Sequence, residues 1–204
     1  SDLEEINRII PTIKKIRKKF PDLIISVDTV RSSVATEALL CGADIINDVS
    51  GGYGDKKMIE VLKQHRCPYI LTHNIVKSIN NDKLKSENTI KDIIRFFSKR
   101  IKELKTHGVY DIIIDPGFGF SKSIEQNFEL IKYFEMLHVL HTPIMVGISR
   151  KSMIYNMLET KPDESLNGTS IMHSFLISRN ASIFRVHDVK EMKEVKMLWK
   201  ASYY

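Results

Sequence analysis

Six short runs of apolar, mostly β-branched residues recur along the chain, and longer stretches with helical spacing of apolar residues separate them. The runs do not alternate apolar with polar residues, which is typical of strands covered on both faces in a parallel sheet. This repeated strand–helix order predicts a parallel α/β fold. The predicted strands are Leu23–Ile25, Ile45–Ile46, Tyr69–Leu71, Ile112–Ile114, Ile144–Val146 and Ile183–Phe184. The predicted helices are Leu3–Phe20, Ser32–Leu40, Ser86–Thr106, Ile124–Leu140 and Ser165–Ser178.

Polar side chains follow nearly every predicted strand at its carboxyl end. Ligand chemistry collects at these ends in parallel α/β barrels, whereas an open doubly wound sheet uses only the few strands at a switch point. Because so many strand ends carry polar groups, we expect a parallel (β/α)8 barrel of the TIM type. The polar groups are Asp28–Thr29, Asn47–Asp48, Thr72–His73, Asp115, Ser149–Lys151, and Arg185 with His187–Asp188.

The number of predicted strands falls short of a closed barrel. A barrel of this type usually needs about 250 residues, and this chain has 204. The first predicted element is a helix, so we expect this chain to hold about six of the eight strands, with two strand–helix units before it. No linker or break in composition divides the chain, so we treat residues 1–204 as one barrel domain, incomplete at its N-terminus.

The charge balance weighs against a nucleic-acid partner. Lys and Arg number 31 against 25 Asp and Glu, a net charge of +6. The basic residues are spread over predicted helices, as in Lys14–Lys19, which favours solvated helix faces. Cys41 and Cys67 do not have the Cys-x-x-Cys spacing that is typical of metal and redox sites. They are predicted to be reduced thiols of a cytoplasmic protein. The acidic start does not resemble a signal peptide, and no apolar run is long enough to cross a bilayer, so no membrane partner is expected.

The first two strand ends each leave two interpretations open. Asp28 places a carboxylate just beyond a strand, where it either binds a ligand or caps the helix that starts at Ser32. Asn47 offers an amide, which donates and accepts hydrogen bonds at once and suits the edge of a heterocycle. The segment 47–52 is also typical of an ordinary turn, which the sequence alone favours slightly.

The segment Asp115–Phe120 is the sharpest single motif. Its aspartate directly follows three isoleucines, and the loop then carries two glycines and two phenylalanines. A carboxylate at a buried strand edge accepts two parallel hydrogen bonds from an N–C–NH2 group, which makes a strong charge-assisted pair. Glycines allow close approach of the backbone, and phenylalanines supply a flat wall for an aromatic ligand. A simple turn is the alternative.

The last two strand ends carry cations. Gly147–Ser152 brings together Arg150, Lys151 and two serines. In Arg185–Asp188 the side chains alternate, so Arg185 and His187 face the same way and form a cradle suited to a diphosphate. The alternative for this segment is a salt bridge between Arg185 and Asp188.

In this order, the five motifs resemble dihydropteroate synthase, a family of pterin-binding transferases with a TIM barrel. The resemblance runs from about residue 4 to about residue 198, and the last two motifs separate it from methyltetrahydrofolate methyltransferases. The five motifs are Ser26–Thr29, Ile46–Gly51, Asp115–Phe120, Gly147–Ser152 and Arg185–Val189.

The resemblance implies a role for each strand-end residue. Asp28, Asn47, Asp115 and Lys151 would bind the pterin, and Arg185 would stack on its ring. Arg185 and His187 would hold the diphosphate. Phe120, Lys151 and Ser152 would line the p-aminobenzoate site. Of these, Asp115, Lys151 and Arg185 would be catalytic, with Asp115 stabilising the pterin cation that forms as diphosphate leaves.

The resemblance also implies the reaction and its partners. The expected reaction joins 6-hydroxymethyl-7,8-dihydropterin diphosphate to p-aminobenzoate, giving 7,8-dihydropteroate and diphosphate in folate biosynthesis. Mg²⁺ is the expected cofactor, acting on the diphosphate as a Lewis acid. A homodimer is expected. No metal ligand is expected within this chain, because the family's metal-binding Asn belongs to one of its first two strand loops.

Two departures from the family pattern bear on these expectations. The family's first two strand loops have no counterpart here, so we expect that this chain alone is not a competent enzyme. Thr72 takes the place of an apolar pterin contact, and residues 74–78 lack the family's glycine. Two alternatives follow: a methyltetrahydrofolate-binding methyltransferase on the same barrel, or a truncated, non-catalytic pterin-binding paralogue.

Overall fold

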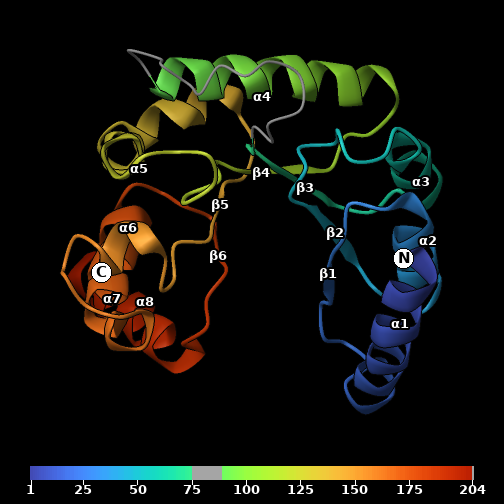
Figure 1. Cartoon of the computed structure of the whole chain (residues 1–204), viewed down its shortest axis with the longest axis horizontal. Helices are drawn as coiled ribbons and strands as arrows, with labels where there is room; N and C mark the ends of the chain where they lie inside the picture. Colours follow the sequence, from blue (N-terminus) through green and yellow to red (C-terminus); the bar gives the residue numbers. More distant parts are fainter. Residues whose placement is uncertain (75–88, 204) are drawn as a thin grey trace. The chain divides into compact units, whose positions relative to one another are not determined.

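A computed structural model describes residues 1–74 and 89–203 of the chain (Figure 1). Its described part forms two compact units, one of residues 1–74 with 99–114, the other of residues 89–98 with 115–203. The strands are β1 (Ser26–Asp28), β2 (Ile45–Asp48), β3 (Tyr69–Thr72), β4 (Ile112–Asp115), β5 (Met145–Val146) and β6 (Ile183–Phe184). The helices are α1 (Asp2–Lys19), α2 (Ser32–Leu40), α3 (Met58–His65), α4 (Thr89–Thr106), α5 (Ile124–Lys132), α6 (Ser152–Tyr155), α7 (Leu166–Ser178) and α8 (Val189–Tyr203), with 3-10 helices η1 (Phe134–Leu140) and η2 (Pro162–Glu164).

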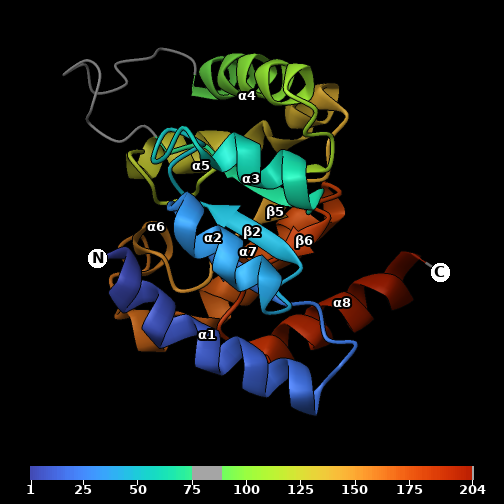
Figure 2. The same ribbon diagram turned by 90° about the vertical axis from the view of Figure 1, so that its right-hand side faces the viewer.

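The first unit is built on a sheet of strand order β1-β2-β3-β4. The β1–β2 and β2–β3 pairs are parallel, as the sequence predicts. Helices α1, α2 and α3 lie on one side of β1 and β2 in Figure 1, and the turned view of Figure 2 shows these helices packed side by side in a row. This helical layer covers one of the two faces that strands with unbroken apolar sequences bury.

The strand register decides which side chains share a face of this sheet. Asp28 pairs with Asn47, and Asn47 pairs with Ile70 on β3. Since side chains alternate along a strand, Thr72 lies on the same face as Asn47 and Asp28. Asp48 pairs with Leu71 and lies on the opposite face. The polar residues at these strand ends therefore divide into two groups with different surroundings.

The second unit contains the parallel pair β5–β6, in which Met145 lies beside Ile183. Helix α7 carries Gly168, an unfavourable residue inside a helix unless packing requires it. A Cβ at Gly168 would lie 2.7 Å from both Ile154 Cγ2 and Leu158 Cδ1. The close packing of the α6 segment therefore accounts for this glycine.

The structure corrects two predicted elements. The run Leu23–Ile25 precedes β1 instead of forming it, because Arg17 donates to the carbonyl of Leu23 at 2.8 Å and Asp44 accepts from the amide of Ile25 at 2.7 Å. The predicted helix Ile124–Leu140 ends at Lys132 and continues as η1. In η1, Phe134 and Leu137 are buried three residues apart, which matches the 3-10 repeat.

Six strands in the described residues agree with the predicted number. The prediction of a single domain stays a prediction. Within residues 1–74 and 89–203, no helix combines the length and the apolar character that a membrane crossing requires.

The buried His173 on α7 makes the stability of the fold sensitive to acid. Its ring packs edge-on against Phe184, with 5.5 Å between ring centroids, and burial lowers its pKa to about 4. The unfolded chain binds a proton at this residue near pH 6.5, whereas the folded chain does not. The stability due to neutral His173 is therefore complete above pH 6.5 and is lost as the pH falls toward 4.

We expect the free energy of unfolding to drop by about 2 to 3 kcal/mol over this pH window because of His173 alone. Urea denaturation at pH 7 and pH 4.5 measures this drop for the wild type and for His173→Met. The variant should lose less stability on acidification than the wild type does. Equal losses in both proteins would show that His173 is not the acid-sensitive group.

Candidate functional site

Asp28 and Asn47 form the polar centre of the first unit's sheet face. The Asn47 side-chain amide donates to Asp28 Oδ2 at 3.0 Å. Asn47 is buried, and its Oδ1 atom has no hydrogen-bond partner among the described residues. A buried acceptor without a partner is unfavourable unless a ligand or water satisfies it. Together the two side chains offer acceptors to an N–H-rich ligand edge.

The alternative role for Asp28, as a helix cap, is wrong. Helix α2 begins at Ser32 with Arg31 as its N-cap, and the amide of Ser32 donates instead to Asp55 Oδ2 at 2.9 Å. Thr29 donates to Glu5 at 2.7 Å and does not cap the helix. Asp28 therefore ends β1 with its side chain exposed and hydrogen-bonded to Asn47.

The segment after β2 is a turn, which was one of the two interpretations of the sequence. Asp48, the last residue of β2, has a structural role in this turn. Asp48 is fully buried and accepts from the Tyr69 hydroxyl at 2.8 Å and from the amide of Ser50 at 2.8 Å. Arg100 donates to the carbonyl of Gly52 at 3.2 Å and stacks over the Tyr53 ring at 4.5 Å. These contacts fix the turn that follows Asn47, and none of them uses Asn47 itself.

Thr72 ends β3 on the face that carries Asn47. Its hydroxyl is buried and has no hydrogen-bond partner among the described residues. The predicted replacement of an apolar contact by threonine thus leaves a second unsatisfied polar atom on this face. Residues 75–78 of the segment that lacks the family's glycine lie outside the described residues.

Asp115 is the buried carboxylate of the second unit, with an exposed fraction of 3%. Its Oδ1 atom accepts from the amide of Gly117 at 2.8 Å. Burial raises the pKa of this carboxyl group, and the Gly117 amide and the cations of Lys151, Arg185 and Lys122 act in the opposite direction. Such a preorganised negative charge can stabilise a cation that develops beside it.

Lys151 is one of the cations that act on this carboxylate, and it contacts Phe120. The Lys151 ammonium donates to the carbonyl of Phe118 and lies 4.2 Å from the centre of the Phe120 ring. Burial lowers the pKa of Lys151 to about 8, while Asp115 raises it. Gly119 is required here, because a Cβ would lie 2.7 Å from Lys151 Cδ and the residue has a φ of +76°.

Arg185 and His187, the predicted diphosphate cradle, follow β6 with exposed side chains. The Arg185 guanidinium lies against Gly147, where a Cβ would be 2.9 Å from its Nη2 atom. His187 hydrogen-bonds Ser149 Oγ through Nδ1 at 3.1 Å.

The alternative for this segment, a salt bridge from Arg185 to Asp188, is wrong. Arg150 instead donates to both carboxylate oxygens of Asp188, and its Nε contact measures 2.9 Å. Asp188 is therefore neutralised by Arg150, which leaves Arg185 beside Gly147. Ser152, predicted to line the site, begins α6 with an exposed side chain.

Two residues that contact the loop after β4 were not predicted from the sequence: Lys122 in the loop itself and Asn127 on α5. Lys122 Nζ donates to the carbonyls of Gly117 and Phe120 at 2.9 and 3.2 Å. Asn127 is buried and accepts from the amide of Gly119 at 2.8 Å. Both residues lie within a helical or near-helical sequence pattern, which gives no sign that they fold back onto the loop.

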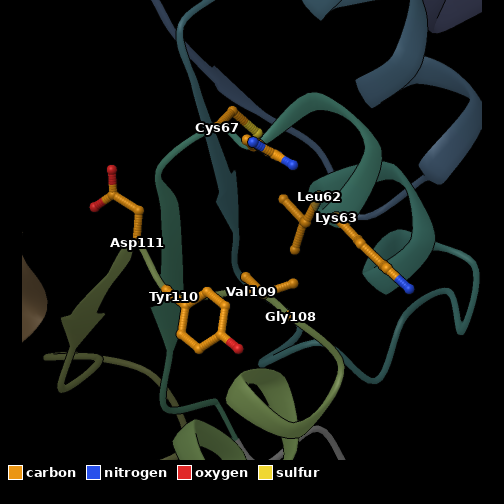
Figure 3. A pocket seen from close by; sticks show the side chains of 8 residues that line it. Leu62, Lys63, Cys67, Gly108, Val109, Tyr110 and Asp111 are labelled. Carbon is orange, nitrogen blue, oxygen red and sulfur yellow. The ribbon is translucent and has the colours of Figure 1, made fainter.

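A pocket of about 500 Å³ lies in the first unit at the opposite ends of β3 and β4 (Figure 3). Its buried floor consists of Leu62, Cys67 and Val109, and exposed side chains such as Tyr110 and Asp111 form its rim. Cys67 precedes β3 and Asp111 directly precedes β4. This pocket therefore contains none of the residues predicted to bind a ligand.

The described residues contain no cluster of three His, Cys, Asp or Glu side chains that could hold a metal ion. Mg²⁺ is usually bound by one or two carboxylates together with water and substrate phosphates.

Comparisons with known proteins agree on one family. Residues 1–187 match the family described as "Pterin binding enzyme". The chain is 36% identical over 199 residues to a dihydropteroate synthase of Streptococcus pyogenes, which covers 96% of this chain and 72% of that protein.

Two solved structures are similar over the whole chain. A Yersinia pestis DHPS with a pterine–sulfa conjugate is 31% identical, with a TM-score of 0.92, and the match covers 77% of that protein. A Clostridium difficile dihydropteroate synthase in the presence of pteroic acid is 35% identical, with a TM-score of 0.92 and 76% coverage. The fold class is thus the parallel α/β barrel of the TIM type.

Proposed function

Because the chain belongs to the dihydropteroate synthase family of pterin-binding enzymes, we propose that its strand-end residues bind and activate the family's pterin substrate. Its activity is the condensation of 6-hydroxymethyl-7,8-dihydropterin diphosphate with p-aminobenzoate. The observation that carries the site proposal is the buried Asp115 carboxylate, surrounded by Lys151, Arg185 and Lys122.

Asp28, Asn47 and Asp115 are the proposed pterin-binding acceptors. The Oδ1 atom of Asn47, which no described residue hydrogen-bonds, and the exposed carboxylate of Asp28 suit the N–H groups of a pterin. Asp115 can accept from an amidine-like edge in a charge-assisted pair, although its backbone contact with Gly117 already occupies one oxygen. Lys151 supplies donors for the ring carbonyl, and the planar Arg185 guanidinium suits stacking on the ring.

The reaction breaks the bond from the pterin methylene carbon to the diphosphate oxygen and forms a bond from that carbon to the arylamine nitrogen. Positive charge develops over the pterin as diphosphate leaves with the bonding electrons. Asp115 stabilises this charge because its carboxylate is already fixed in place. The arylamine then attacks and loses one N–H proton. No covalent intermediate with the protein is required.

Arg185 and His187 are proposed to hold the diphosphate, and Phe120, Lys151 and Ser152 to line the p-aminobenzoate site. A guanidinium beside an imidazole can donate several hydrogen bonds to phosphate oxygens. The ring of Phe120, with the Lys151 ammonium 4.2 Å from its centre, offers an aromatic wall next to a cation that suits an aryl carboxylate.

Mg²⁺ is proposed as the cofactor from the family resemblance. When bound, it would neutralise charge on the departing diphosphate. Since the described residues form no metal-binding cluster, the ion would arrive with the diphosphate.

We also propose a homodimer in the cytoplasm. Met197 and Leu198 on α8 and Phe175 on α7 are exposed apolar side chains, which suit a self-complementary interface. The free thiols Cys41 and Cys67 suit a reducing compartment. Sedimentation that gave a monomer mass at micromolar protein concentration would contradict the dimer.

The test of the proposed function is product formation from the two substrates. The full-length protein, with the two strand–helix units that are expected before residue 1, is incubated with 6-hydroxymethyl-7,8-dihydropterin diphosphate, p-aminobenzoate and Mg²⁺, and both 7,8-dihydropteroate and diphosphate are quantified. We expect equimolar products, and loss of both when EDTA is added. Tight pterin binding without either product would support the non-catalytic alternative. Methyl transfer from methyltetrahydrofolate would support the methyltransferase alternative.

A further inference from the structure

The loop after β4 is held by hydrogen bonds from lysine side chains. Gly117 and Gly119 have φ angles of +72° and +76°, and Ser121 has a φ of +48°, which is uncommon for a residue with a side chain. The carbonyls of Gly117 and Phe120 accept from Lys122, and the carbonyl of Phe118 accepts from Lys151. Such a loop keeps its shape only if its surroundings fix it.

Helix α5 supports the same loop from its first turn. Asn127 accepts from the amide of Gly119 at 2.8 Å and donates to the carbonyl of Ser123 at 2.7 Å. Ser123 caps α5 through a capping box with Gln126. The loop is thus attached at Gly119 to a well-capped helix, and at Phe120 to Lys122.

These contacts reach the residues proposed to bind p-aminobenzoate. Lys122 fixes the carbonyl of Phe120, and the Phe120 ring lies against the Lys151 ammonium. Lys122 is largely buried, and burial lowers its pKa to about 7 while Asp115 raises it. A buried ammonium is unfavourable unless it is well paired, so its hydrogen bonds to the loop are needed to keep it charged.

We propose that Lys122 is a positioning residue for the arylamine side of the site, acting through the loop that carries Phe120. This inference rests on the proposed function, because it assigns Phe120 and Lys151 to p-aminobenzoate. Lys122 itself need not touch either substrate. Its removal should therefore weaken p-aminobenzoate binding selectively and leave the pterin side nearly unchanged.

The steady-state parameters of Lys122→Met test this assignment. We expect the KM for p-aminobenzoate to rise by about tenfold, as for loss of a charge-assisted hydrogen bond. The KM for the pterin diphosphate and kcat should change by less than about threefold, since Asp115 remains in place. Lys122→Arg keeps a cation and should recover part of the loss. Lys132→Met, an exposed lysine on α5, is the matched control and should behave as wild type.

A pH series separates this role from general weakening of the fold. Lys122 loses its proton as the pH rises through about 7, so the wild-type KM for p-aminobenzoate should rise over that range. The same KM should be flat over that range in Lys122→Met. The charged groups facing Lys122 are Asp115 and Lys151, and Lys151 titrates about one pH unit higher.

Three results bear on the inference separately from the proposed function. An unchanged KM for p-aminobenzoate in Lys122→Met, with an active wild type, would overturn the inference alone. An equal rise in the KM values for both substrates, together with lowered thermal stability, would show that Lys122 has only a structural role. That result would also overturn the inference. A wild type that makes no product would instead count against the proposed function, and binding of p-aminobenzoate to wild type and variant would then decide the role of Lys122.

Discussion

Asp115→Asn is expected to reduce kcat by about 30-fold or more, which corresponds to roughly 2 kcal/mol of lost transition-state stabilisation. Asparagine keeps the oxygen that accepts from the Gly117 amide, so the loop should retain its shape. The negative charge is lost, however, and it matters most when the pterin cation forms. The KM for the pterin diphosphate should therefore change less than kcat does.

A matched control exists directly before the same strand. Asp111 directly precedes β4 and is exposed, whereas Asp115 ends this strand and is buried. Asp111→Asn should retain the activity and stability of the wild type. If Asp115→Asn also kept near-normal turnover, the electrostatic role proposed for Asp115 would be wrong.

Lys151→Met is expected to have a similarly large effect, with a loss of about 100-fold in kcat/KM for p-aminobenzoate. The variant removes the donor to the carbonyl of Phe118 and the cation beside Phe120. It also removes one of the cations that counteract the raised pKa of Asp115. On the acid side of its pH profile, the variant should consequently need a higher pH than the wild type to reach full activity.

The wild-type pH profile gives an independent check on Lys151. Its ammonium loses a proton as the pH rises through about 8, so turnover should fall above that pH. Lys161→Met, at an exposed lysine in the segment between α6 and α7, serves as the control. Activity in Lys151→Met within twofold of the control would show that Lys151 contributes to neither substrate site.

The sequence patterns predict the strands well because buried parallel strands need continuous apolar runs. The exception is Leu23–Ile25, where Leu23 and Ile24 are exposed, Arg17 donates to the carbonyl of Leu23, and Asp44 accepts from the amide of Ile25. The contact between Asp44 and Ile25 joins residues 19 positions apart, so no local pattern could reveal it. The positions of Asp28, Asn47 and Asp115 at the carboxyl ends of strands could be predicted, because the end of an apolar run marks the end of a strand in the sequence.

Pairings among charged side chains are harder to predict from the sequence than strands are. Proximity in sequence favours a salt bridge from Arg185 to Asp188, but Arg150, 38 residues away, is the partner of Asp188. The same limitation hides Lys122, whose importance depends on the left-handed glycines that bring the carbonyls of Gly117 and Phe120 within its reach. Both cases depend on loop geometry, which residue spacing does not specify.

A crystal structure of the protein with bound 6-hydroxymethyl-7,8-dihydropterin diphosphate tests the central claim most directly. The pterin ring should lie at the carboxyl ends of the strands, with its N–H groups within hydrogen-bond distance of the Asp115 carboxylate and of Asn47 Oδ1. The diphosphate should contact Arg185 and His187. A pterin bound in the pocket beside Cys67 and Tyr110, or bound without contact to Asp115, would contradict the account.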